Sequence, residues 1–319
     1  MYYIGIDVGG MSIKGGLVTE NGAIVARHTV ETQRYDENYG IADDLRKVID
    51  GVLAAGNTDL SQIVGIGIGQ PGSVDSERGI IRYSNNIPLE NIPVVAQLKQ
   101  YYDVPVYINN DANCAALGEY VFGAGKGYRD IVFVTLGTGV GGGIIIDGKL
   151  FEGRECAGAE AGHMVIVCGG EPCNCGRRGC WEAYASVSAL IRQTKAAMEK
   201  DPSSLMHEEA AAEGKVSGKT AFVAAKRGDR TAQEVVDKYI YYVGEGLVNL
   251  ADIFRPDAIL LGGAISKEGE RLTVPLQKKM NAEAFGSKFN PGIAVKIASL
   301  RNDAGILGAA ALINAYQRS

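Results

Sequence analysis

The sequence predicts an α/β fold made of two similar halves. Residues 3–30 read as strand, glycine turn, strand, Asn21-Gly22 turn and strand. The same order returns from residue 131 and ends in an Asp147-Gly148 turn, which indicates an internal duplication. Short apolar runs and helical spacing alternate along the remaining chain, as is typical of α/β domains. The 319 residues are enough for about two domains.

The first half is expected to begin with hairpins, because an Asn-Gly pair is a strong hairpin signal. Apolar residues between Ile41 and Leu53 follow the period of an amphipathic helix. The apolar runs at 63–68 and 104–108 are short enough to be buried strands.

The second half repeats the opening and then becomes helical. Residues 131–136 and 143–146 are apolar runs that flank a glycine cluster. Apolar residues from Val236 to Phe254 recur at steps of four and three, which predicts the clearest helix of the chain. The other expected elements are a helix near 187–191, a polar surface excursion at 200–218, strands at 259–261 and 295–300, and a final helix at 304–316.

Charge and composition exclude several classes of function. The net charge is −5 and the isoelectric point is about 5.4, and no basic run is present, which argues against nucleic acid as the main partner. A strand-like segment opens the chain where a signal peptide would lie, and no apolar run reaches membrane-spanning length. We therefore expect a cytoplasmic protein with no membrane partner.

The glycine cluster at 137–142 formally matches the dinucleotide-binding pattern, but that pattern needs a helix to follow. An apolar strand-like run and a hairpin turn follow instead, so we reject that interpretation. The segment 214–220 looks like a Walker A loop, yet it has one residue too few between its glycines and follows a polar helical stretch. We interpret it as a false match.

Two hairpin loops are the better candidates for phosphate binding, since successive N–H groups in a glycine turn can cradle anionic oxygens. Asp7 ends the first strand just before Gly9 and Gly10, where a carboxylate can hold Mg²⁺. Ser12 and Lys14 add a hydroxyl and a positive charge. The alternative is that the glycines only make tight hairpins, but two loops in matching positions favour phosphate.

The cysteines predict a metal site. Three of the six lie at Cys173, Cys175 and Cys180, with glycines between them, and this spacing favours zinc over three free buried thiols. His163 is the best candidate for the fourth ligand, and Cys168 is the alternative.

Carboxylates and amides near these motifs are candidates for binding and catalysis. Glu160 lies close to His163 in the sequence, and Glu182 follows the last cysteine, so a metal could fix all three around a pocket suited to a polyol. Glu182 could equally be an ordinary first-turn helix carboxylate. Asp111 follows the strand at 104–108 and could accept a proton from an attacking hydroxyl, although an Asx cluster there could simply cap a helix.

Together these motifs resemble the ROK family (repressors, open reading frames, kinases) and, within it, the bacterial ATP-dependent glucokinases. The likeness covers nearly the whole chain. It is carried by Asp7-Val-Gly-Gly-Met-Ser-Ile-Lys, Leu136-Gly-Thr-Gly-Val-Gly-Gly-Gly, Leu261-Gly-Gly-Ala, Ala304-Gly-Ile-Leu-Gly-Ala-Ala and, most specifically, Glu160-x-Gly-His followed by Cys-x-Cys-Gly-x-x-Gly-Cys-x-Glu.

The resemblance implies the actin-like (ribonuclease H-like) sugar kinase fold, with two domains and a central cleft. We expect a small domain of residues 1–110 with 304–319 and a large domain of residues 111–303 that carries the zinc. The implied activity is phosphorylation of a hexose at its 6-hydroxyl with ATP and Mg²⁺, with structural Zn²⁺, and glucose is the expected sugar. The implied partners are sugar and ATP, in a homo-oligomer.

The resemblance also assigns roles to residues of this sequence. Asp111 would be the catalytic base, and the zinc ligands would be His163, Cys173, Cys175 and Cys180. The sugar would be bound by Asn110, Asp111, Glu160, His163, Glu182, Gly72, Ser73 and Asn85 or Asn86. ATP would be bound by Asp7, Gly9, Gly10, Met11, Ser12, Lys14, Gly137, Thr138, Gly139, Gly262 and Gly263.

One residue departs from the family pattern, and several functions stay open. The family usually has Thr where this chain has Met11, which removes a hydroxyl near the phosphates. N-acetylmannosamine, N-acetylglucosamine, fructose and allose are alternative substrates. A non-catalytic sugar sensor is a further alternative. A repressor would carry a DNA-binding domain before the first phosphate motif, which begins at Asp7, so we do not expect one.

Overall fold

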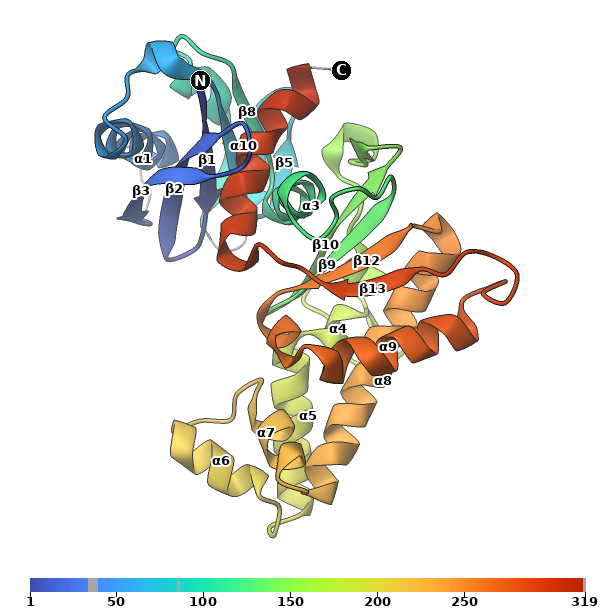
Figure 1. The fold of residues 1–319 in the computed structure, drawn as a ribbon. Coiled ribbons are helices and arrows are strands. Elements are labelled where there is room, and N and C mark those ends of the chain that lie inside the picture. The colour runs from blue at the N-terminus through green and yellow to red at the C-terminus, as the bar shows by residue number, and fades with distance from the viewer. Residues whose placement is uncertain (34–39, 85–86, 318–319) are drawn as a thin grey trace. The chain divides into compact units, whose positions relative to one another are not determined.

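A computed structural model of the protein describes residues 1–33, 40–84 and 87–317 (Figure 1). The chain forms two compact units. The first consists of Met1–Asp130, Gly143–Ala159 and Ser299–Ser319, and the second consists of Ile131–Gly142 and Glu160–Ala298. The domain limits given above stay a prediction. Residues 111–130, 143–159 and 299–303, which that prediction puts in the large domain, group here with the first unit.

The first sheet has the strand order β3-β2-β1-β4-β8. The first three strands form the two antiparallel hairpins predicted from the sequence, and β4 and β8 continue the sheet in parallel. The bounds are β1 Tyr2–Val8, β2 Ser12–Thr19, β3 Ile24–Glu31, β4 Ile63–Gln70 and β8 Val106–Asn110.

The second sheet repeats this topology, with the order β11-β10-β9-β12-β13. Strands β10 and β11 form an antiparallel hairpin. Strands β12 and β13 continue the sheet in parallel on the other side of β9. The predicted duplication is therefore confirmed at the level of strand order. The bounds are β9 Ile131–Leu136, β10 Val140–Ile146, β11 Lys149–Leu150, β12 Ala258–Gly262 and β13 Ala294–Ile297.

The helices agree with the expected positions where the apolar period is strong. Those of the first unit are α1 Ile41–Ala55, α2 Val94–Leu98, α3 Asp111–Phe122 and α10 Ala304–Gln317. Those of the second unit are α4 Glu182–Ala185, α5 Val187–Lys200, α6 Met206–Glu213, α7 Thr220–Lys226, α8 Arg230–Phe254 and α9 Glu270–Glu283. Short 3₁₀ turns complete the secondary structure: Leu60–Gln62, Arg154–Cys156, Ala161–His163, Ala264–Glu268 and Arg301–Asp303.

Some elements lie outside what the sequence analysis predicted. The segment 200–218 contains α6, and Gly214 ends that helix in the left-handed conformation, so the Walker-like segment is a helix end as expected of a false match. A small antiparallel sheet of β5 Ser73–Asp75, β6 Ile80–Ser84 and β7 Leu89–Ile92 was missed. Helices α2, α7 and α9 were missed too. Among the described residues, we find no helix with the length and apolar character needed to cross a membrane.

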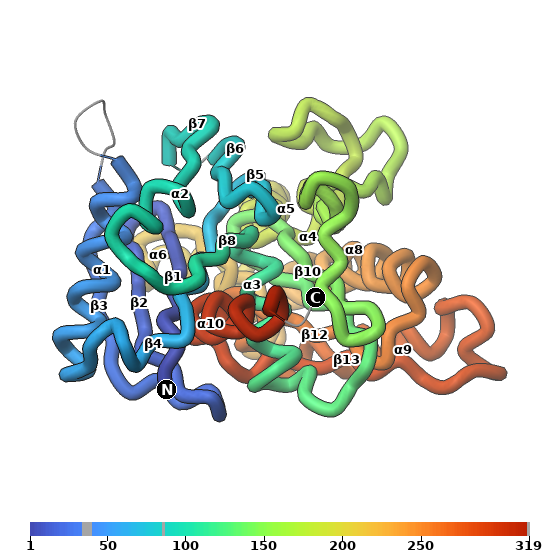
Figure 2. The backbone as a smooth tube through the Cα atoms, turned by 90° about the horizontal axis from the view of Figure 1, so that it is seen from above, coloured from blue at the N-terminus to red at the C-terminus, as the bar shows by residue number. Residues whose placement is uncertain are grey.

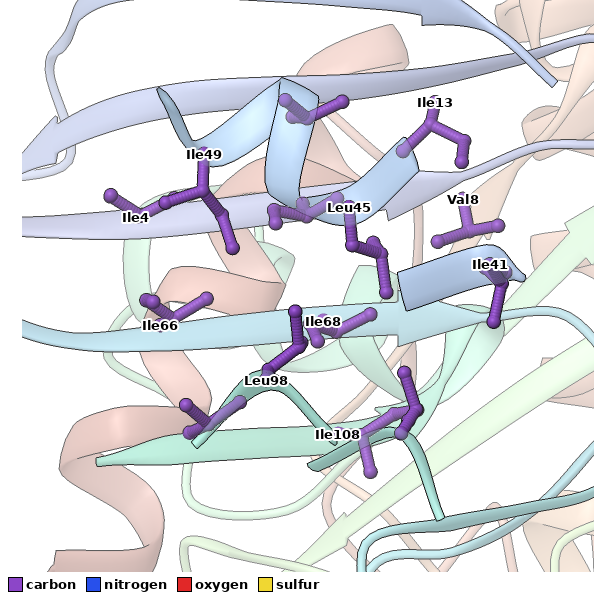
Figure 3. Close-up of a cluster of buried hydrophobic side chains, with 14 of the residues drawn as sticks. Ile4, Val8, Ile13, Ile41, Leu45, Ile49, Ile66, Ile68, Leu98 and Ile108 are labelled. Carbon is purple, nitrogen blue, oxygen red and sulfur yellow. The ribbon is translucent and has the colours of Figure 1, made fainter. Parts of the chain in front are cut away.

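One face of the first sheet is covered by α1 (Figure 3). Ile41, Leu45 and Ile49 come from the helix, and Ile4 and Ile68 come from the strands. All five are at most 1% exposed. Burial of each such side chain is worth about 1.5–3 kcal/mol relative to exposure, so this layer holds β1 and β4 in place.

Helix α10 covers the opposite face, and glycines let it approach closely (Figure 2). A Cβ atom on Gly5 of β1 would lie 2.0 Å from the carbonyl oxygen of Ile306. One on Gly67 of β4 would lie 1.8 Å from the carbonyl oxygen of Ala309. The same helix meets α3 at Gly308, where a Cβ would lie 1.6 Å from the carbonyl oxygen of Cys114. Helix α10 therefore packs backbone against backbone at these three glycines, and any side chain there would force the helix away from the sheet or from α3.

We expect Gly308→Ala to lower the free energy of unfolding by about 3 kcal/mol or more. The methyl group would meet rigid backbone of α3, and this outweighs the gain of about 1 kcal/mol in helix propensity. Urea unfolding measures the change. Gly292→Ala is the matched control, because its added Cβ meets nothing within 4 Å, and it should stay within about 0.5 kcal/mol of the parent. Equal stability of the two variants would contradict the packing account.

Candidate functional site

The first glycine loop (residues 9–12) joins β1 to β2. Asp7 is opposite Lys14 in the antiparallel register, so the predicted carboxylate and cation sit on paired positions. The Gly9 N–H donates to the Ser12 carbonyl over 3.0 Å and closes the turn. Met11 is 88% exposed at its tip. The tip of the loop therefore carries an apolar side chain that is hardly packed against the rest of the unit.

Thr32, which the sequence analysis did not consider, braces this loop. Its hydroxyl donates to the Gly9 carbonyl over 2.7 Å, and its N–H donates to the Met11 carbonyl over 3.1 Å. Because the hydroxyl is committed to the backbone of the loop, it stabilises the turn. We infer that it does not replace the hydroxyl that the family carries at position 11.

Asp7 lies against the first turn of α10. A Cβ atom on Gly305 would be 2.7 Å from the carboxyl carbon of Asp7, so only glycine leaves room there. Burial and the nearby charge of Asp111 raise the pKa of Asp7 from 3.8 to about 6, while Lys14 lowers it. A half-buried carboxylate held near a second one is a costly arrangement that a bound cation would relieve.

We expect Asp7→Asn to stabilise the metal-free protein near neutral pH. The pKa of Asp7 is higher in the folded state than in the unfolded state, so folding favours the protonated carboxyl. The parent therefore loses unfolding free energy as the pH rises from about 4 through about 6, because Asp7 must then ionise in its buried position. Two pKa units correspond to about 3 kcal/mol. The difference in unfolding free energy, variant minus parent, should therefore grow toward that value between pH 4 and pH 7. A difference that does not change with pH would contradict this.

Asp111 is the first residue of α3, directly after β8. The helix is capped by its neighbour Asn110, whose Oδ1 accepts from the N–H groups of Ala112 and Asn113 over 2.8 and 3.2 Å. Burial raises the pKa of Asp111, although the Ala112 N–H and other donors oppose the shift. Asn110 is therefore the residue that caps α3, and Asp111 is not needed for capping. This leaves Asp111 as a partly buried carboxylate with increased proton affinity, as a general base requires.

Two predicted sugar-binding residues meet at this junction. The Asn110 Nδ2 donates to the Gly72 carbonyl over 3.0 Å. Gly72 has a φ of 101°, and a Cβ there would lie 2.2 Å from the Tyr83 carbonyl oxygen, which explains the glycine. Ser73 follows as the exposed first residue of β5. Asn85 and Asn86 lie outside the described residues.

The second glycine loop (residues 137–139) belongs to the second unit. The Gly137 N–H donates to the Gly139 carbonyl over 3.0 Å. The start of α5 holds the loop from outside: the Val187 N–H donates to the Gly137 carbonyl, and the Ser188 hydroxyl donates to the Thr138 carbonyl, each over 2.8 Å. The loop is thereby anchored through its carbonyls and the Gly137 N–H, so the N–H groups of Thr138 and Gly139 are the part available to an anion.

Gly262 and Gly263 lie beside this loop in the second unit. Gly262 pairs with Thr135 of β9, and Gly263 has a φ of 83°. A Cβ on Gly263 would lie 2.4 Å from the Leu136 carbonyl oxygen. The structure therefore brings these two predicted ATP-binding glycines to the strand end from which the second glycine loop begins.

The four predicted metal ligands form one cluster. The Nδ1 or Nε2 atom of His163 and the Sγ atoms of Cys173, Cys175 and Cys180 all lie within 4.8 Å of one another. Cys173 Sγ is 3.6 Å from His163 Nδ1, and Cys175 Sγ is 3.6 Å from Cys180 Sγ. Cys168, the alternative ligand, is exposed and outside this group. Three thiols and one imidazole at these separations fit a closed tetrahedral site.

Glu182 connects this cluster to the second glycine loop, which the sequence did not predict. Its Oε2 accepts from the Val140 N–H over 3.0 Å and would lie 2.4 Å from a Cβ on Gly139. Its Oε1 is 3.9 Å from Cys173 Sγ. The turn at 160–163 reaches the same strand, because a Cβ on Gly162 would lie 2.1 Å from the Val140 carbonyl oxygen. Glu160 itself is exposed at the start of that turn.

Comparison with known proteins shows the family to which the chain belongs. Residues 3–316 match the ROK family. The chain belongs to the ROK family. Among its relatives, a protein named glucokinase from Thermotoga maritima is 40% identical over 97% of this chain and 96% of its own length. A glucokinase from Halalkalibacterium halodurans is 35% identical over 100% of this chain and 96% of its own length.

A solved structure gives the same fold for this ROK protein. It is that of a ROK family glucokinase from Streptomyces griseus in complex with glucose and AMPPNP, with 37% identity and a TM-score of 0.81. The match covers 98% of this chain and 99% of that one. With the duplicated sheets described above, it confirms the predicted actin-like sugar kinase fold.

Proposed function

We propose that this protein phosphorylates glucose at its 6-hydroxyl with ATP and yields glucose 6-phosphate. The observation that carries the proposal is the joint presence of an Asp111 carboxylate with raised pKa and two braced glycine loops in a chain 35–40% identical to full-length glucokinases. A non-catalytic sensor would have no use for such a base. Phosphoryl transfer itself asks mainly for positioning and charge stabilisation.

The proposed roles follow the chemistry of each residue. Asp111 takes the proton of the sugar hydroxyl as that oxygen attacks the terminal phosphorus in line, and ADP leaves as the phosphorus–oxygen bond to the β-phosphate breaks. Backbone N–H groups of the two glycine loops bind the phosphates, and Lys14 adds a positive charge. Asp7 would hold Mg²⁺, which neutralises phosphate charge when bound. Gly262 and Gly263 would contact the nucleoside through their backbone.

The sugar and zinc sites share residues. In the second unit, Glu160 and Glu182 would accept hydrogen bonds from sugar hydroxyls, and His163 would donate one through the ring N–H that does not bind zinc. In the first unit, Asn110 and the Gly72–Ser73 turn would contribute further contacts to the sugar. His163 and the three cysteines would hold Zn²⁺, which would fix the imidazole and leave the N–H of its second ring nitrogen for the sugar. The 3.9 Å approach of Glu182 to Cys173 supports a link between metal and sugar binding.

A coupled ADP-release assay with ATP and Mg²⁺ tests the function. The panel holds glucose, fructose, allose, N-acetylglucosamine and N-acetylmannosamine, and we expect strong turnover with glucose. Turnover with another sugar only would overturn the choice of glucose and keep the kinase. No turnover with any sugar, in folded and zinc-replete protein, would overturn the enzyme and favour the sensor.

A further inference from the structure

A polar network in the first unit is not explained by the proposed roles. Its centre is the carboxylate of Glu152, just after β11. The Ser76 hydroxyl donates to Glu152 Oε1 over 2.6 Å, and the Asn109 Nδ2 donates to the same oxygen over 2.9 Å. The Tyr316 hydroxyl, at the end of α10, donates to Glu152 Oε2 over 2.9 Å. Three segments far apart in the sequence thus direct donors at one carboxylate.

These contacts fix the orientation of the Asn109 side chain. An ionised carboxylate only accepts hydrogen bonds, so the amide must turn its Nδ2 toward Glu152. Its Oδ1 then faces the other way, where it accepts from the Asn110 N–H over 2.7 Å and from the Asn113 Nδ2 over 3.0 Å. Asn109 is 2% exposed, so water cannot readily replace these partners.

The Tyr316 hydroxyl bridges Asn109 and Glu152, as an acceptor to the first and a donor to the second. It accepts from the Asn109 Nδ2 over 2.6 Å. Burial and the charge of Glu152 raise the pKa of Tyr316, so the hydroxyl keeps its proton and remains a donor to the carboxylate. Every hydrogen bond around Asn109 therefore has one allowed direction, and Glu152 sets it.

The consequence reaches the junction between β8 and α3. Asn109 holds the Asn110 N–H and the side chain of Asn113, while Asn110 caps α3 at the N–H groups of Ala112 and Asn113. Asp111 lies between these fixed points, so the β8–α3 turn that carries it is held on both sides. We propose that Glu152, acting through Asn109, is a positioning residue that holds the base Asp111 in its reactive orientation. The inference rests on the proposed function.

The first test is Glu152→Gln in the full-length protein. The amide of glutamine would direct a donor at Ser76, Asn109 or Tyr316, and Asn109 would lose its fixed direction. We expect kcat with glucose to fall by about ten- to a hundredfold, because small errors in position cost that much in rate. KM for ATP should stay within about twofold, since the glycine loops are untouched.

Glu155→Gln is the matched control. It lies on the same loop, and its side chain is 56% exposed and paired with Arg82. Its kcat should equal that of the parent. The parent's turnover is measured first: if the parent does not turn over glucose, the proposed function fails, whereas an active parent with an equally active Glu152→Gln variant overturns the inference alone.

A swapped pair separates positioning from mere stability. Asn109→Asp alone would set two carboxylates 2.9 Å apart and should also lose turnover. In the Asn109→Asp/Glu152→Gln double variant the donor and acceptor exchange places: the introduced glutamine donates to the introduced aspartate, which still accepts from the Asn110 N–H. We expect kcat of the double variant to exceed that of either single variant by about fivefold or more. A double variant no better than the worse single variant would overturn the proposal.

If Glu152→Gln does not fold, Tyr316→Phe provides a second test of the proposal. Tyr316→Phe removes one donor to Glu152 and one acceptor from Asn109 but keeps the ring, which packs on Tyr107 at a centroid distance of 5.4 Å. It should lower kcat by a smaller factor than Glu152→Gln, about threefold to tenfold, with KM for ATP unchanged. An unchanged kcat in Tyr316→Phe, with an unfolded Glu152→Gln variant, would reduce the network to a structural role.

Discussion

Asp111→Asn should lower kcat with glucose by about a thousandfold and leave glucose affinity within a fewfold of the parent. The amide keeps the size of the side chain but cannot accept the hydroxyl proton, and a general base contributes about 10²–10⁴ in rate. Burial raises the pKa of Asp111, so the parent's kcat should also fall on acidification at a higher pH than a solvated aspartate would give. Steady-state kinetics against pH and calorimetric glucose titration measure both effects.

Stability provides the control for this variant. Asn110, not Asp111, caps α3, so the helix should remain intact. The raised pKa means that folding disfavours the ionised Asp111, so Asp111→Asn should unfold at the same or a higher urea concentration at pH 7. Asp147→Asn, at an exposed hairpin, should keep full activity. Near-normal turnover by Asp111→Asn would remove Asp111 as the base.

The opening of each half could be predicted because its signals are local. Asn21-Gly22 and Asp147-Gly148 both lie in hairpin turns, and Gly22 and Gly148 take positive φ angles. Asp147-Gly148 is a two-residue turn, whereas Asn21-Gly22 belongs to a four-residue connection, residues 20–23. The helix predicted from the strongest apolar period is confirmed as α8, which ends at Phe254 as expected. It begins earlier than the apolar run, at Arg230, where the Asp229 side chain caps it. The β5–β6–β7 sheet was missed because strands of three to five residues carry too few alternating positions to recognise.

The cysteine spacing placed the metal cluster, and the ordered motifs placed both glycine loops. What the sequence could not supply are contacts between segments distant in the chain. Thr32 braces a loop 23 positions earlier, and Glu152 meets Tyr316 from 164 positions away. Neither residue carries a motif, since a threonine or glutamate has the same local preferences wherever its partner lies. The contact of Glu182 with the second glycine loop is also a contact between distant segments. The position of Glu182 just after Cys180 indicated a functional residue, but nothing in the sequence indicated that it accepts from the Val140 N–H.

Cys175→Ser should abolish zinc binding and lower glucose affinity about tenfold or more. Loss of one thiolate opens the closed ligand set, and both His163 and Glu182 then lose the metal-held geometry beside which they would bind the sugar. The melting temperature should fall by about 10 °C, because metal binding contributes directly to folding. Metal analysis, calorimetric glucose titration and thermal unfolding measure the three effects.

Cys175 is the informative ligand to change because its side chain is exposed, unlike the buried Cys180. Serine at an exposed position costs little in packing, so the loss of stability reports the metal rather than a cavity. Cys168→Ser is the matched control, a thiol that is also exposed but lies outside the cluster, and it should match the parent in all three measurements. If zinc-free Cys175→Ser binds glucose with full affinity, the metal only folds the turn between residues 163 and 180. If affinity falls while Cys168→Ser stays normal, the metal acts through His163 and Glu182 on the sugar itself.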